Sequence, residues 1–226
     1  MGENREIWAL LTISLIGLLQ TFFFIGPNII VTTNSIPVFL LFTSVCVLGA
    51  VATVLPHKCG HKGLPNTLDP VRYTDYMGVR FIHGHHKLCG GFKNHEIEFK
   101  GKSICAACLG LLIGVIIAWS ISFHHFILGF NYPQTTGYLG LLFTFLGLVY
   151  IPLLKPENPL LRTLYNSLFV VGFALILVVV DNKGVSANDY LIIGLSLFWM
   201  YSRIQFSSWG HNQICNHCDN PCDNCD

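Results

Sequence analysis

Long apolar runs separated by short polar segments dominate the chain. Each run approaches the roughly 20 apolar residues that a helix needs to cross the hydrocarbon core of a bilayer. Turn-forming or charged residues end most of them, as Gly26-Pro27-Asn28 does for the first. The pattern predicts an all-α, polytopic membrane protein with about six transmembrane helices, at residues 7–26, 36–55, 104–126, 138–154, 160–180 and 190–206.

These spans predict four parts of the chain. They are two N-terminal transmembrane helices (1–55), a Cys/His-rich loop (56–103), four transmembrane helices (104–206) and a Cys-rich tail (207–226). The first run does not fit a signal peptide, because it is too long for an h-region, lacks a small-residue cleavage site and is followed by a second span. Only 11% of the residues are charged, against about a quarter in soluble domains. Much of the surface is therefore expected to face lipid.

Basic residues predict the orientation. If the N-terminus is cytoplasmic, only Lys183 of the 13 Lys and Arg residues falls in an outer loop. Positively charged loops stay on the cytoplasmic side of membranes. We therefore expect a multi-pass protein of the cell membrane, with both termini, the loop and the tail in the cytoplasm. A net charge of +1 gives no sign of nucleic-acid binding.

Cysteine and histidine gather in the two polar segments. Of nine cysteines and ten histidines, all but Cys46, His124 and His125 lie in or beside the loop and the tail. The cytosol keeps thiols reduced, so we expect thiols or metal ligands there instead of structural disulfides.

The loop has the spacing of a metal site. His86-x2-Cys89 is followed after fifteen residues by Cys105-x2-Cys108, which matches a zinc ribbon with one Cys replaced by His. A loop of this length has few large apolar residues, so a bound metal would supply the stability that a core cannot. Rival ligands are His57, Cys59, His61, His83, His85 and His95.

Cys105 and Cys108 also admit a redox interpretation. They open the third predicted span, and the amides and dipole of a helix N-terminus favour a thiolate. The intervening Ala106-Ala107 and the lack of a preceding thioredoxin-like βαβ pattern weigh against redox chemistry. Metal ligation is the favoured interpretation.

The tail holds a denser cysteine cluster. Cys215-x2-Cys218-x3-Cys222-x2-Cys225 places four thiols in eleven residues, which suits zinc or, alternatively, an iron–sulfur cluster. The spacing differs from both bacterial and plant-type ferredoxins. His211 or His217 would be able to replace one cysteine. The contrary interpretation is a tail with unliganded thiols.

The segment from Cys89 to Gly114 resembles a family of small prokaryotic integral membrane proteins of unknown function. That family has a Cys, a short polar stretch with a Gly, and a C-A-R-C-x-G motif that opens a transmembrane helix. The matching positions are Cys89, Gly101, Cys105, Ala106, Cys108, Gly110 and Gly114. Ala107 stands where the family usually has Arg. The resemblance implies a membrane-bound cysteine site and no particular activity.

The predicted spans hold few polar groups. We expect Arg162 and Arg203 to reach the lipid headgroups, and Trp199 to join an aromatic belt. Gly110-x3-Gly114 predicts a face for helix packing. The adjacent His124 and His125 are interpreted as polar residues at the outer interface.

Three functional hypotheses follow. The favoured one is a structural or regulatory zinc module that presents a cytoplasmic face to a protein partner. The second is an electron carrier with an iron–sulfur cluster on the tail, and the third is a thiol-redox protein using Cys105 and Cys108. Metal transport is disfavoured, because we find no acidic or lysine side chain near the middle of any span. No nucleophile triad, phosphate loop or nucleotide fingerprint names a reaction.

Overall fold

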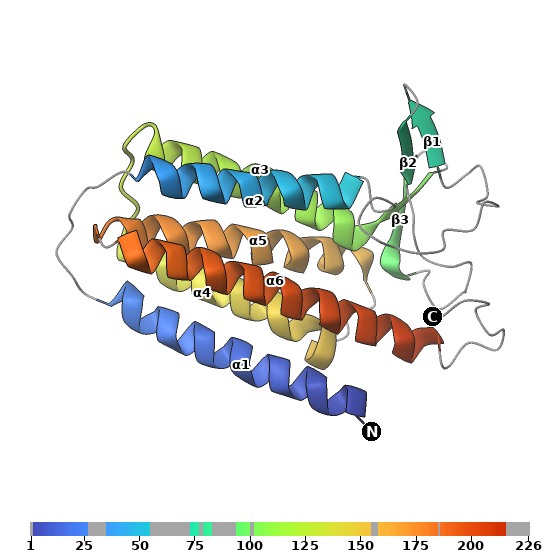
Figure 1. Cartoon of the computed structure of the whole chain (residues 1–226). Helices are drawn as coiled ribbons and strands as arrows, with labels where there is room; N and C mark the ends of the chain where they lie inside the picture. The colour runs from blue at the N-terminus through green and yellow to red at the C-terminus, as the bar shows by residue number, and fades with distance from the viewer. Residues whose placement is uncertain are drawn as a thin grey trace.

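A bundle of α-helices with two β-hairpins at one end forms the structure (Figure 1). The computed structural model describes residues 2–26, 35–54, 73–76, 79–82, 94–99, 102–154, 158–184 and 186–215. In these residues the α-helices are α1 (Gly2–Ile25), α2 (Ile36–Val54), α3 (Ala106–Phe126), α4 (Gln134–Val149), α5 (Pro159–Asp181) and α6 (Ser186–Cys215). The strands are β1 (Tyr73–Tyr76), β2 (Val79–Ile82), β3 (Glu96–Phe99) and β4 (Lys102–Cys105). We call the end that carries the strands the hairpin end.

Four helices are long and apolar enough to cross a bilayer. They are α1 over Asn4–Ile25, α3, α4 continued to Leu154, and α5. The apolar stretch of α2, Ile36–Val51, is shorter, and α6 is not among the four. Length and composition thus support a helical membrane protein, while six spans stays a prediction.

Local signals place the helix ends close to the predicted positions. Asn158 caps α5, since its side-chain oxygen accepts a hydrogen bond from the Leu160 amide at 2.8 Å, and Pro159 occupies the first turn. The exception is α6, which continues to Cys215 instead of ending at Phe206. Gly210 lies within this extension, where an added Cβ would lie 3.4 Å from the Ile151 side chain.

A wide turn closes α4. Residues Tyr150–Leu154 form a π-helical turn, labelled η4, that contains Pro152. Proline has no amide hydrogen and its ring collides with the preceding turn of an α-helix, so a wider turn accommodates it. The turn carries the Tyr150 side chain into the interior, where it is 1% exposed.

Helix α5 lies at the centre of the bundle. Its apolar window is 78% buried, against 28% for α3 and 33% for α1, and it packs most extensively on α3 and α4. A Cβ added at Gly110 would lie 2.3 Å from the Thr163 carbonyl oxygen, and one at Gly114 would lie 2.8 Å from the Ser167 carbonyl oxygen. The predicted packing face of Gly110 and Gly114 is confirmed.

Both hairpins are antiparallel, and neither was predicted. β1 pairs with β2, and β3 pairs with β4 with Glu96 opposite Cys105. The chain passes directly from β4 into α3, so Cys105 is both the last strand residue and the N-cap of the helix. The alternation of Glu96-Ile97-Glu98-Phe99 and the turn residue Gly101 carried this signal in the sequence.

The predicted aromatic belt is wrong for Trp199. This indole is fully buried between helices and donates to the Ser14 carbonyl oxygen of α1 at 3.1 Å. Ser14 also donates to Ser202 of α6 at 3.2 Å. Tryptophan often lies at the membrane interface, where its indole N–H meets water. Trp199 is buried between α1 and α6 instead, because its indole N–H has a hydrogen-bond partner inside the bundle.

Candidate functional site

Two thiols meet where β4 becomes α3. Cys105 is 2% exposed, and Cys108 lies one helical turn further along and is partly buried. The two side chains are hydrogen-bonded to each other, and neither belongs to a disulfide. The spacing Cys-x2-Cys therefore does bring both sulfur atoms to one place, as a metal site or a redox pair requires.

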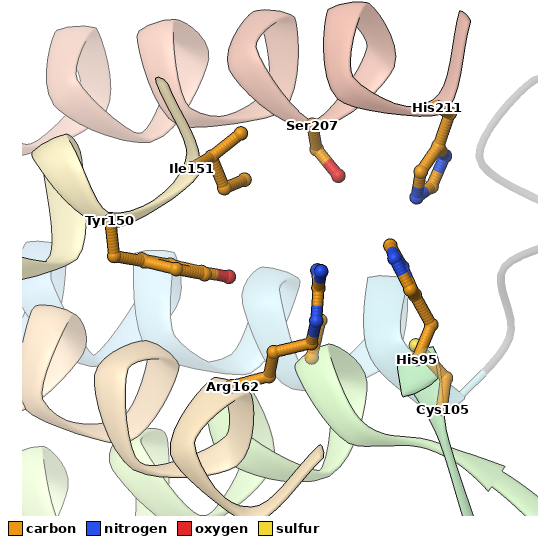
Figure 2. A pocket seen from close by; sticks show the side chains of 8 residues that line it. His95, Cys105, Tyr150, Ile151, Arg162, Ser207 and His211 are labelled. Carbon is orange, nitrogen blue, oxygen red and sulfur yellow. The ribbon is translucent and has the colours of Figure 1, made fainter. Parts of the chain in front are cut away.

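Two histidines face each other beside these thiols (Figure 2). His95 immediately precedes β3, and His211 lies in the last turns of α6; their ring centroids are 5.7 Å apart. Two imidazoles on one tetrahedral zinc ion, with Zn–N bonds of about 2.0–2.1 Å, place their ring centres about 5 Å apart. The observed separation is close to that value.

A small cavity at the hairpin end is lined by both histidines and by Cys105. Its volume is about 40 Å³, whereas a single water needs roughly 10–15 Å³. It is lined by His95, Cys105, Ala107, Tyr150, Ile151, Arg162, Ser207 and His211. His95 lies just before β3, and the other lining residues belong to β4, α3, η4, α5 and α6. Residues far apart in the sequence therefore build one site.

Most of the predicted ligands fall outside the described residues. These are His86, Cys89, Cys218, Cys222 and Cys225, with the rivals His57, Cys59, His61, His83, His85 and His217. Cys215 is described only as the last residue of α6. Among the residues that the structure describes, no group of three or more His, Cys, Asp or Glu side chains is placed to hold a metal ion. The Cys105/Cys108 and His95/His211 pairs are thus donors at one end of the bundle, not a completed site.

Arg203 does not reach the headgroups, contrary to the prediction. It is 6% exposed and lies inside the bundle. It donates to the Asn166 side-chain oxygen at 2.8 Å and to the Tyr150 hydroxyl, and its guanidinium carbon lies 4.4 Å from the Tyr150 ring centroid. Arg162 was also expected at the headgroups, but its side chain lines the cavity (Figure 2). The helices that pack around Arg203 supply the polar partners that water or headgroups would otherwise have to supply.

His125 is also not the interface residue that we predicted. It is 1% exposed, with one ring nitrogen 2.8 Å from the Asp181 carboxylate and the other 2.9 Å from the Phe130 carbonyl oxygen. Asp189, at the start of α6, lies against Asp181. Burial, with a smaller contribution from the Asp181 charge, raises the pKa of Asp189 to about 8. His124 is exposed, in agreement with the interpretation of an interface residue.

Comparison with known proteins adds no assignment. The chain matches no protein-family model, no curated protein and no solved structure. The resemblance carried by Cys89, Cys105 and Cys108 therefore stays a prediction from the sequence.

Proposed function

We propose that this chain is a multi-pass protein of the cell membrane whose hairpin end binds zinc at the cytoplasmic face. The observation that supports this most is the convergence of a thiol pair and an imidazole pair on one end of the bundle. Cys105 and Cys108 are in contact, and His95 and His211 line the same cavity as Cys105.

The chemistry of these donors favours zinc. Two thiolates and two imidazoles are a common ligand set of structural zinc sites. Arg162 lines the same cavity as Cys105, and positive charge beside a thiol favours the thiolate that binds metal. The loop and tail cysteines, Cys89 and Cys215 among them, would complete this site or form a second one.

A zinc ion here would be structural or regulatory. It would tie the β3–β4 hairpin to the end of α6 and so fix a surface that a protein partner is able to bind. We assign the imidazoles and thiols of this cavity to metal binding and propose no reaction for it.

The test is metal analysis of protein purified anaerobically in detergent. The wild type should carry zinc without visible absorption, and the double change Cys105→Ser/Cys108→Ser should remove about one zinc ion per chain. Cys46→Ser is the matched control, because Cys46 lies in α2 away from the site. For the imidazoles, His95→Ala and His211→Ala should weaken zinc retention, whereas the exposed His124→Ala should not. Unchanged zinc content in the double cysteine variant would refute the site.

Contact between Cys105 and Cys108 supports one alternative, a thiol-redox pair. Metal-free protein in which these two thiols form a disulfide of defined potential would replace the zinc proposal with this one. Iron and sulfide with broad visible absorption would instead favour an iron–sulfur cluster on Cys215, Cys218, Cys222 and Cys225.

The orientation is tested separately. A membrane-impermeant thiol reagent should label the tail cysteines in inside-out vesicles and not in right-side-out vesicles. The reverse pattern would place the hairpin end outside the cell.

A further inference from the structure

Two arginines share the hairpin end of the bundle without an acidic partner. Neither the Arg162 nor the Arg203 guanidinium forms a salt bridge with a carboxylate among the described residues. The Nε atoms of both are buried and have no hydrogen-bond partner there. The two guanidiniums also repel each other. Burying like charges is costly unless an opposite charge is near.

The Tyr150 hydroxyl has a hydrogen that none of its neighbours among the described residues accepts. An arginine only donates, so the oxygen of Asn166 must face Arg203 and its NH₂ group must face the Tyr150 hydroxyl, at 2.8 Å. The same hydroxyl also accepts from Arg203. Because its oxygen accepts two hydrogen bonds, its hydrogen is left to donate, and the hydroxyl points into the cavity (Figure 2).

The cavity therefore presents donors and positive charge to whatever fills it. Arg162 and Ser207 reach into it from α5 and α6, opposite the Tyr150 hydroxyl. Its volume of about 40 Å³ admits a group of a few atoms. Guanidinium groups match the planar pairs of oxygen atoms on phosphate, and a phosphate dianion carries as much charge as two arginines.

We propose that the cavity between Arg162, Tyr150 and Ser207 binds a phosphate group, carried either by the headgroup of a membrane lipid or by a soluble anion. Arg162 and the two hydroxyls contact the phosphate oxygens, and Arg203 holds Tyr150 in place and adds charge. The zinc donors Cys105, His95 and His211 line the same cavity, but the groups that contact phosphate are guanidinium and hydroxyl groups.

The experiment uses the full chain both with and without a metal chelator, so that loss of zinc and loss of phosphate binding are measured separately. One arm titrates inorganic phosphate into protein in neutral detergent at constant ionic strength and measures heat and thermal stability. The other arm compares protein from nanodiscs of phosphatidylcholine with protein from nanodiscs that also contain phosphatidic acid. Native mass spectrometry identifies the lipid that stays bound to the protein.

The decisive variant is Arg162→Gln, and its matched control is Arg5→Gln, which removes an exposed arginine from the same end of the bundle. We expect Arg162→Gln to weaken binding about tenfold or more, as loss of a charge-assisted hydrogen bond does. Tyr150→Phe keeps the ring over which Arg203 lies and should weaken binding by a smaller factor. Circular dichroism and gel filtration confirm that the variants fold.

Binding in the phosphate arm identifies a soluble anion, and retention of phosphatidic acid identifies a lipid headgroup. Either result supports the proposal if Arg162→Gln loses the binding and Arg5→Gln keeps it. The proposal is overturned if the wild type binds in neither arm, or if Arg162→Gln binds as tightly as Arg5→Gln.

Discussion

The crossing of α3 and α5 depends on glycine, and Gly110→Ala tests it. The added methyl would lie 2.3 Å from the Thr163 carbonyl oxygen, whereas side chains essentially never approach closer than 3.0 Å. The obstacle is backbone, so no side-chain rotation relieves the clash. The two helices would have to move apart by most of an ångström.

Separation would also weaken hydrogen bonds that bridge the helices. Thr163 donates to the Ala106 carbonyl oxygen at 3.0 Å, and Ser167 donates to the Gly110 carbonyl oxygen at 2.8 Å. Overpacking costs about 1–3 kcal/mol, and each weakened hydrogen bond adds about 1 kcal/mol. We therefore expect Gly110→Ala to lower the free energy of unfolding by about 3 kcal/mol.

Gly194→Ala is the matched control. A Cβ at Gly194, in α6, meets nothing within 4 Å, and alanine is the better helix former. This change should leave stability equal or slightly higher. Reversible unfolding in mixed micelles with increasing SDS, followed by circular dichroism, gives both values. Equal stability of the two variants would refute the close crossing of α3 and α5.

Two further predictions concern buried polar groups. Asn166→Ala removes a hydrogen-bond partner of both Arg203 and Tyr150. It should lower the free energy of unfolding by about 3 kcal/mol in the same SDS assay. The control Asn4→Ala, at an exposed position, should lower it by less than about 1 kcal/mol, and equal losses would contradict the network. Because burial raises the pKa of Asp189 from its ordinary 3.8 to about 8, the folded state holds a proton that the unfolded chain releases between these values. Stability should therefore fall as the pH rises from about 5 to about 8, and Asp189→Asn should reduce this pH dependence; an unchanged slope in that variant would disprove the assignment.

Local hydrophobicity accounts for what the sequence predicts well. An apolar run of helical length is readable without knowing its neighbours, and so each predicted span coincides with a described helix, although α6 continues past its predicted end. Gly110 and Gly114 also carry a local signal, since their spacing places them on one helix face.

Contacts between distant elements account for what sequence reasoning missed. Arg203 near the end of an apolar run looks like a side chain that reaches the headgroups, and nothing beside it in the sequence indicates otherwise. A comparison across spans would have helped, because Tyr150, Asn166 and Arg203 all lie toward one end of their predicted spans and would meet at one depth in the membrane. The meeting of His95 and His211 depends in the same way on the continuation of α6 past the predicted end.

The central position of α5 has a consequence for how this protein tolerates mutation. Nearly every residue from Asn166 to Asp181 is buried, so no side of that stretch faces away from the other helices. Saturation mutagenesis across α5 should show intolerance without a helical period. Along α1, where buried Ile7, Leu11, Ser14 and Leu18 alternate with exposed positions, tolerance should instead rise and fall about every 3.6 residues. The pattern of tolerated substitutions would therefore identify the central helix without a structure.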